Sequence, residues 1–242
     1  MASEKRKIIE TGVQGFDMMI DGGIKENSSI VISGGPGSGK TIFALEFAVH
    51  GALKNENSLY VSFEQNEDDL IRQASLLTKS PETLLKQKKL FFLHIDPAKM
   101  DKNIIDEIRT IIEKNKIKRL VIDSLSFLLL NPVFFKEGKF TLINNGDVKV
   151  AGNIQQFIYL FITSLNKAKT TTLYISSINE NNTQTKDSVS EYVCDGYITL
   201  SRNRIGKSVI RTIEVIKMRD TKTLGGIYPF SIDENGIRVE TT

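Results

Sequence analysis

A glycine-rich run at residues 34–41, GGPGSGKT, ends in a lysine and a threonine. It fits the pattern G-x-x-x-x-G-K-[ST]: the glycine backbone wraps around phosphate oxygens, the lysine reaches the β- and γ-phosphates, and the threonine hydroxyl binds Mg²⁺. The run follows an apolar segment and opens a helical pattern, which is the context that this pattern requires. The sequence therefore predicts a nucleoside-triphosphate site whose contacts are Gly35, Pro36, Gly37, Ser38, Gly39, Lys40, Thr41 and Ile42.

Two carboxylates stand at the ends of other apolar segments. Asp123 ends the run RLVID, and we expect it to hold Mg²⁺ together with Thr41; the alternative is that it caps the next turn. Glu64 ends the run SLYVSFE, where the ligand-facing groups of an open α/β sheet gather. We expect Glu64 to act as a catalytic residue that activates a water molecule beside the γ-phosphate, and Lys40 to assist there. The alternative role for Glu64 is a charge at a helix N-terminus.

Short β-branched runs alternate with segments of helical periodicity up to about residue 190. The expected strands cover 28–34, 58–64, 90–96, 119–124 and 171–177. The expected helices cover 40–54, 66–77, 103–115 and 153–168. Such alternation produces a parallel sheet with helices on both faces. Further on, 196–220 and 228–240 predict consecutive strands. The predicted fold is therefore α/β, a P-loop NTPase with a mainly parallel twisted sheet and a C-terminal antiparallel β-meander.

The segment at 134–150 interrupts this alternation. Asn145–Gly146 lies between KFTLI and DVKV and is a strong signal for a two-residue hairpin turn. We therefore expect an inserted β-hairpin at about 134–150, which is either a surface excursion or a contact for a substrate or partner. Neither a linker nor a repeat divides the chain, and we expect a single domain over residues 1–242.

The composition restricts the class of protein. The chain has 242 residues, a formal net charge of +3 and a single cysteine, Cys194, which excludes an internal disulfide framework. The mild positive charge permits an acidic partner without requiring one. The first residues lack the apolar segment of a secretory signal, and the most apolar run, 120–135, is too short and too interrupted to cross a membrane. We expect a cytoplasmic protein without a membrane partner.

These motifs, in this order, resemble the RecA-like ATPases and more closely their KaiC-like branch. The resemblance is carried by the stretch from 11 to 52 around the glycine-rich run and by LYVSFE, LVIDSLS, VCDGYITL and IKMRDTKTLGGIYPFSIDENGI. It implies a RecA-like fold, ATP and Mg²⁺ as cofactors, and hydrolysis of ATP. It also implies that Glu64 is the catalytic glutamate, the first of a usual Glu-Glu pair whose second member is Gln65 here.

The resemblance also implies a role for two basic residues in IKMRD. Lys217 and Arg219 are two positions apart on an expected strand, so their side chains lie on the same face. In the family, residues at these positions reach the γ-phosphate bound by the adjacent subunit, which implies a homo-oligomer, either a hexamer-like ring or a filament. Without the resemblance, such residues on an edge strand protect against aggregation. The chain departs from the family at Thr223 and Gly225, where a histidine and a lysine are usual.

Two other functions stay open. One is an accessory protein of DNA repair, related to recombinases, that binds single-stranded DNA through the hairpin at 134–150, the polar loop at 179–190 and the basic residues Arg202, Arg204, Lys207 and Arg211. Against it, the polar loop is not basic and the hairpin offers few aromatic rings for base stacking. The other is an ATP-dependent scaffold or switch with little hydrolysis, which Gln65 and the altered positions 223 and 225 favour.

Overall fold

Nine strands form one central sheet in the structure, a computed structural model that describes residues 7–78, 80–96, 102–128, 135–136, 139–144, 146–178 and 185–241. The parallel part has, in order, β5 (Leu90–His94), β4 (Ser58–Ser62), β6 (Arg119–Asp123), β10 (Thr171–Ser177), β3 (Ser29–Gly34) and β11 (Gly196–Ile205). The antiparallel strands β12 (Ser208–Met218), β13 (Ile227–Asp233) and β14 (Gly236–Val239) then continue from β11. The predicted mainly parallel sheet with a C-terminal antiparallel meander is confirmed.

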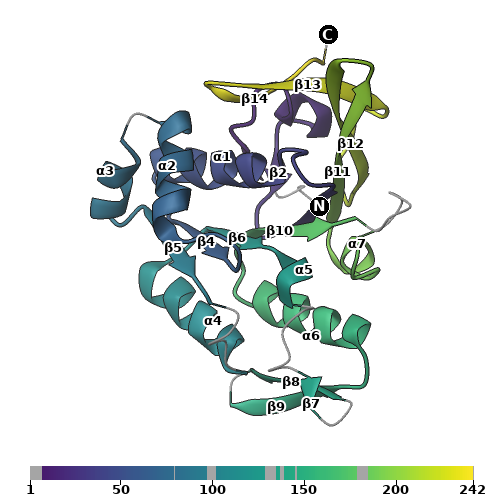
Figure 1. Ribbon diagram of the computed structural model, residues 1–242. Coiled ribbons are helices and arrows are strands. Elements are labelled where there is room, and N and C mark those ends of the chain that lie inside the picture. Colours follow the sequence, from purple (N-terminus) through teal and green to yellow (C-terminus); the bar gives the residue numbers. More distant parts are fainter. Residues whose placement is uncertain are drawn as a thin grey trace, which may run out of the picture.

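Helices cover both faces of the parallel strands (Figure 1). One face carries α1 (Lys40–Leu53), α2 (Glu67–Leu77) and α3 (Pro81–Lys86). The other carries α4 (Ile104–Asn115), α5 (Leu125–Leu128) and α6 (Ile154–Asn166). Because apolar side chains are covered on both sides, β3, β4 and β6 are buried along their whole length, which is why their sequences are almost continuously apolar.

The expected helices match α1, α2, α4 and α6, and local signals explain two of them. In α4, Ile104, Ile105, Ile108 and Ile112 are buried at helical spacing, so one face of the helix packs on the sheet. The side chain of Asn66 begins α2 by accepting a hydrogen bond from the backbone N–H of Asp69 at 2.9 Å. The turn that follows β4 is therefore short and places Glu64 just before this helix.

Residues 135–151 contribute a separate three-stranded antiparallel sheet of β7 (Phe135–Lys136), β8 (Lys139–Asn144) and β9 (Asp147–Ala151). Asn144 pairs with Asp147, so a two-residue loop joins β8 to β9, and one of its residues, Asn145, lies outside the described residues. This sheet lies beyond α4 and α6, far from the helices on the opposite face (Figure 1).

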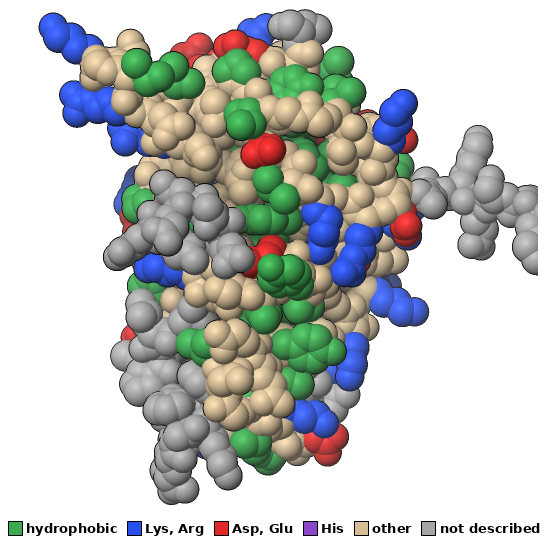
Figure 2. All heavy atoms as spheres, turned by 90° about the vertical axis from the view of Figure 1, so that its right-hand side faces the viewer, with side chains coloured by type: hydrophobic (Ala, Val, Ile, Leu, Met, Phe, Trp, Pro, Cys, Tyr) green, Lys and Arg blue, Asp and Glu red, His purple; other side chains and the backbone are tan. Residues whose placement is uncertain are grey.

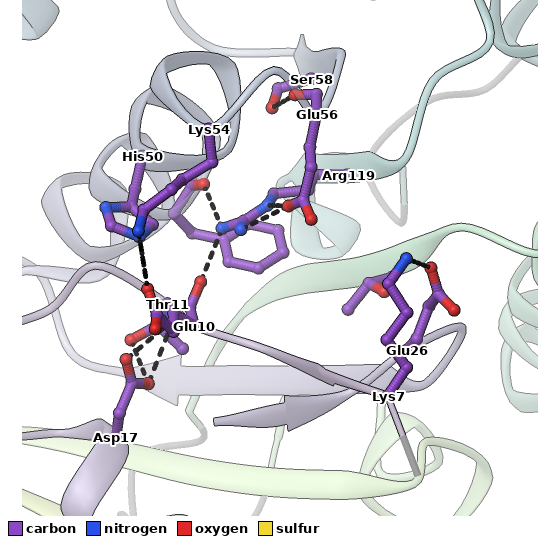
Figure 3. A network of polar contacts seen from close by, with 12 residues as sticks. Lys7, Glu10, Thr11, Asp17, Glu26, His50, Lys54, Glu56, Ser58 and Arg119 are labelled. Atoms are coloured by element: carbon purple, nitrogen blue, oxygen red, sulfur yellow. Dashed lines mark hydrogen bonds and ion pairs between the residues drawn. The ribbon is translucent and has the colours of Figure 1, made fainter. Parts of the chain in front are cut away.

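The N-terminal segment is held by a buried arginine that the sequence does not reveal (Figure 3). Arg119, which is 2% exposed, donates to Oε2 of Glu56 at 2.8 and 2.6 Å and to the carbonyl oxygens of Glu10 and Phe47 at 2.8 and 3.0 Å. Its guanidinium also lies 4.7 Å from the centre of the Phe47 ring. A Cβ on Gly51 would lie 2.3 Å from Cδ of Arg119, so the arginine requires glycine there.

The segment itself contains β1 (Ile8–Ile9), the 3-10 helix η1 (Asp17–Ile20) and β2 (Ile24–Lys25). Both oxygens of Asp17 accept hydrogen bonds from Thr11, which folds the segment back beside α1 (Figure 3). In the part of the chain that the structure describes, every helix is too short or too polar to cross a membrane.

Candidate active site

The phosphate loop joins β3 to α1 at the carboxyl end of the central strand. Gly37 and Gly39 have φ values of 70° and 106°, a left-handed region that favours glycine. A Cβ on Gly39 would lie 3.1 Å from Cδ1 of Ile232, so a side chain there would press against β13. The loop leads directly into α1, whose first turn directs free backbone N–H groups toward it.

Lys40 folds back over this loop. Its Nζ donates to the carbonyl oxygens of Gly34 and Gly35 at 2.8 and 2.9 Å. Burial lowers the pKa of Lys40, while the nearby carboxylates of Asp123 and Glu64 act in the opposite direction. The ammonium is therefore already positioned at the mouth of the phosphate loop, with carbonyl partners that phosphate oxygens can replace.

Thr41, Asp123 and Tyr60 meet beside the loop. Oδ2 of Asp123 accepts from the hydroxyl of Thr41 at 3.1 Å and from the hydroxyl of Tyr60 at 2.5 Å. Burial raises the pKa of Asp123, and the hydrogen bond from Tyr60 opposes that change. The two residues predicted to hold Mg²⁺ are thus in contact, and oxygen ligands of this kind suit that ion. The sequence analysis missed Tyr60; its signal is a phenol inside an apolar strand, because a buried hydroxyl needs a partner.

Glu64 lies just beyond β4, where Ser62 turns the chain. The hydroxyl of Ser62 accepts from the backbone N–H groups of Glu64 at 3.3 Å and Gln65 at 2.9 Å. Oε1 of Glu64 then accepts from the hydroxyl of Ser124 at 2.9 Å, which places this exposed carboxylate beside the residue that follows Asp123. Oε1 of Gln65 is buried and has no hydrogen-bond partner among the described residues.

A cavity of about 440 Å³ opens over the phosphate loop. Its lining comes from Gly37, Gly39, Lys40, Thr41 and Ile42 and, on the other side, from Arg211 and Ile232 of the C-terminal strands. The volume is in the range of small-molecule sites.

Two arginines from the C-terminal strands lie on this side: Arg211 lines the cavity, and Arg202 lies beside Gly37. Arg202 pairs across the strands with Arg211, and a Cβ on Gly37 would lie 3.6 Å from Cδ of Arg202. Nε of Arg211 is buried and has no partner in the described part of the chain. Like charges directly opposite each other destabilise a sheet, so an anion in the cavity would stabilise this pair.

Lys217 and Arg219, the two predicted intersubunit residues, lie at the far end of β12 from the cavity. Lys217 pairs with Tyr197 near the start of β11, whereas Arg211 at the cavity is six residues away along β12, which corresponds to roughly 20 Å. Nζ of Lys217 and Nη2 of Arg219 both donate to the carbonyl oxygen of Tyr192, at 3.5 and 3.1 Å. The two side chains therefore lie on the same side of the strand, and the structure does not bring them to the phosphate loop of their own chain.

A profile of the family described as "ATPase: KaiC" matches residues 9–242, which is nearly all of the chain. The chain belongs to the KaiC family of ATPases. The circadian clock oscillator protein KaiC of Parathermosynechococcus lividus is 29% identical over 243 residues, which cover 95% of this chain and 42% of that protein. The circadian clock protein KaiC2 of Synechocystis sp. is 30% identical over 239 residues, which cover 95% of this chain and 39% of that protein.

Among solved structures, the KaiC-like protein PH0186 from Pyrococcus horikoshii OT3 has the same fold. It superposes with a TM-score of 0.80 at 25% identity, covering 97% of this chain and 99% of PH0186. By contrast, the chain spans only about two fifths of the length of the curated KaiC relatives that it matches. Membership of the family implies ATP binding and ATPase activity; what the longer relatives do as whole proteins does not transfer with it.

Proposed function

We propose that this chain is a Mg²⁺-dependent ATPase whose active site is completed by a neighbouring copy of the same chain. The observation that carries the proposal is the separation of its functional groups. Lys40, Thr41, Asp123 and Glu64 gather around the phosphate loop, whereas Lys217 lies roughly 20 Å along β12 from Arg211, which lines the cavity over that loop. A second protomer is the source that can supply these basic groups to the site.

Within one protomer, each residue has a separate task. ATP is the substrate that supplies the phosphoryl group, and a bound Mg²⁺ would supply positive charge to neutralise its phosphates. The backbone of the loop and Lys40 hold the phosphates, and the Thr41 hydroxyl and the Asp123 carboxylate provide oxygen ligands for the ion. Glu64 takes the proton of the attacking water, and Ser124 holds the carboxylate in place for that task.

The surface around Lys217 and Arg219 supports association with a second copy. Tyr192 is 63% exposed and Ile216 is 50% exposed, and both lie next to these basic residues. Figure 2 shows this side of the molecule, where hydrophobic side chains and Lys or Arg side chains lie next to one another. Exposed aromatic and apolar side chains beside an arginine are typical of surfaces that bind another protein.

The test is ATP turnover measured against protein concentration. We expect turnover per protomer to fall on dilution, together with the apparent mass of the particle, because separated protomers lose the basic groups of their neighbours. Glu64→Gln should abolish turnover and leave ATP binding in place. A dilute monomer that hydrolyses ATP at the full rate would refute the intersubunit site, and unchanged turnover in Glu64→Gln would refute the role of Glu64.

A slow switch is the second candidate function, and one observation favours it. Oε1 of Gln65 is buried without a partner among the described residues, at the position where the family has a second carboxylate. A neutral amide there removes a negative charge beside Glu64, and we expect this change to slow hydrolysis. The single-turnover rate of hydrolysis is compared with the rate of ATP release. An active ATPase hydrolyses ATP faster than it releases it, and a switch releases ATP before hydrolysis.

Binding of single-stranded DNA stays a prediction. Arg211, one of the four basic residues that suggested it, lines the cavity over the phosphate loop, and Arg202 pairs with it across the strands. The loop at 179–184 lies outside the described residues.

A further inference from the structure

A buried carboxylate, Asp187, has four hydrogen bonds to groups of the protein. It is 1% exposed. Its Oδ1 accepts from the backbone N–H groups of Val189 at 3.0 Å and Ser190 at 2.6 Å. Its Oδ2 accepts from the hydroxyls of Ser176 at 2.9 Å and Ser190 at 3.0 Å. A buried carboxylate that satisfies four donors fixes the positions of all the groups that supply them.

These hydrogen bonds tie a short helix to the central sheet. Ser190 begins α7 (Ser190–Val193), so Asp187 satisfies the free N–H groups at the start of this helix. Ser176 belongs to β10, the strand between β3 with the phosphate loop and β6 with Asp123. A second contact, from the hydroxyl of Thr185 to the carboxylate of Glu191, also holds α7.

The backbone carbonyls of α7 hold the two basic side chains. The carbonyl oxygen of Glu191 accepts from Nζ of Lys217 at 2.7 Å, and that of Tyr192 accepts from Nη2 of Arg219 at 3.1 Å. Nη1 of Arg219 also contacts the Asp195 carboxylate at 3.4 Å. Carbonyl groups at the end of a helix carry partial negative charge, which suits both cations. The position of α7 therefore sets the positions of Lys217 and Arg219.

We propose that Asp187 is a positioning residue for catalysis in the neighbouring protomer: by fixing α7 against β10, it orients the carbonyl groups that present Lys217 and Arg219 to the next subunit. The inference rests on the proposed function, since it takes these two side chains to act between subunits. A residue with only a general structural role would impair both sites when it is lost. Loss of Asp187 instead impairs ATP hydrolysis in the site of the neighbour and leaves the site of its own chain competent.

The test uses mixed oligomers. Asp187→Asn keeps the size of the side chain but replaces one acceptor oxygen by a donor group, so α7 loses part of its attachment. We expect turnover to fall about tenfold or more, at little change in ATP affinity, as for the loss of an interaction with charged groups. Ser188→Ala is the matched control, because the Ser188 hydroxyl contacts the carbonyl of Thr185 and not Asp187.

Asp187→Asn is then assembled with Glu64→Gln, which lacks its own base but has intact basic residues. At equal amounts, about one interface in four combines an intact Glu64 with an intact neighbour, so about a quarter of the wild-type turnover should return. Lys217→Ala/Arg219→Ala replaces Asp187→Asn in a parallel mixture. If only that parallel mixture recovers turnover, the proposed function stands and the inference about Asp187 is wrong. If neither recovers, the intersubunit site itself is wrong, and the inference fails with it.

Hydrogen exchange in protein without nucleotide gives a second measurement. We expect the amides of 189–194 to exchange faster in Asp187→Asn, while those of 43–53 in α1 stay unchanged. Equal exchange at 189–194 in the two proteins would overturn the proposal. If Asp187→Asn does not fold, Ser190→Ala, which removes one of the four hydrogen bonds, undergoes the same mixing and exchange measurements with the same decisive outcomes.

Discussion

The hydroxyl of Tyr60 donates a 2.5 Å hydrogen bond to Oδ2 of Asp123, the same oxygen that accepts from Thr41. The bond joins neighbouring strands in the interior, and it opposes the rise in the pKa of Asp123 that burial causes. A carboxylate that has to bind Mg²⁺ must be ionised, so the phenol of Tyr60 helps to keep the metal ligand charged.

Tyr60→Phe should therefore weaken the binding of Mg²⁺ with ATP by about tenfold or more, since a hydrogen bond to a charged group is lost. Binding of ATP without Mg²⁺ should change little. Calorimetric titration of ATP with and without Mg²⁺ measures both. Tyr228→Phe is the control, because that hydroxyl donates to the carbonyl oxygen of Gly225 at 3.2 Å and not to Asp123. Equal Mg²⁺ dependence in Tyr60→Phe and wild type would contradict this role.

Ser124→Ala should lower kcat by roughly tenfold and leave the Kd for ATP unchanged. Its hydroxyl donates to Oε1 of Glu64 at 2.9 Å, and without it the exposed carboxylate loses its fixed orientation toward the attacking water. Single-turnover hydrolysis with saturating ATP measures the effect. Ser75→Ala, on the exposed side of α2, serves as the control. A full rate in Ser124→Ala would show that Glu64 needs no such partner.

Arg211→Met should weaken ATP binding by about tenfold at low salt, because the guanidinium lines the cavity and its buried Nε has no partner in the described chain. Lys207→Met, at the exposed turn between β11 and β12, should leave ATP binding unchanged. The same two proteins test the DNA prediction. If Lys207→Met weakens the binding of single-stranded DNA while ATP binding is kept, the hairpin of β11 and β12 binds nucleic acid after all.

Stability should depend on pH through Glu46. This side chain is 7% exposed on α1, and Oε1 accepts from the backbone N–H of Ile237 at 2.6 Å. Burial raises the pKa of Glu46 from 4.5 to about 8, and the charge of Asp233 adds to the rise. The folded protein therefore binds a proton that the unfolded chain releases in this window, so the free energy of unfolding falls as the pH rises from about 4.5 to about 8.

Glu46→Gln removes this titration and keeps an acceptor for Ile237. Relative to wild type it should gain on the order of 3 kcal/mol between about pH 5.5 and about pH 8.5, measured by urea unfolding. Glu82→Gln, an exposed glutamate on α3, should behave as wild type. Parallel stability curves for Glu46→Gln and wild type would show that Glu46 is ionised throughout.

Local patterns predicted the parts of the site that lie within one strand, loop and helix. The glycine-rich run predicted the phosphate loop, because its glycines and its lysine and threonine are neighbours in the chain. The alternation of strands and helices predicted the parallel sheet and the covered faces. The strand predicted over 58–64 is too long by two residues. β4 ends at Ser62, because the hydroxyl of Ser62 turns the chain by accepting hydrogen bonds from the backbone N–H groups of Glu64 and Gln65.

Contacts between distant segments could not be predicted in the same way. Tyr60 and Asp123 are 63 residues apart, and only the pairing of β4 with β6 brings them together. The parallel pairing of β11 with β3 likewise depends on the path of the whole chain, from Gly196 back to Ile30. The contacts of Lys217 and Arg219 with α7 follow from that path, and no local pattern marks Asp187 as the residue that fixes the helix.

The central claim is that one ATP site uses groups from two protomers. The most direct measurement is ATP turnover in oligomers that contain Glu64→Gln and Lys217→Ala/Arg219→Ala protomers in equal amounts, purified through a different tag on each. Each protein alone should be inactive, and the mixture should recover about a quarter of the wild-type turnover, because one interface in four unites the intact halves. A mixture as inactive as its components, or full turnover by Lys217→Ala/Arg219→Ala alone, would contradict the account.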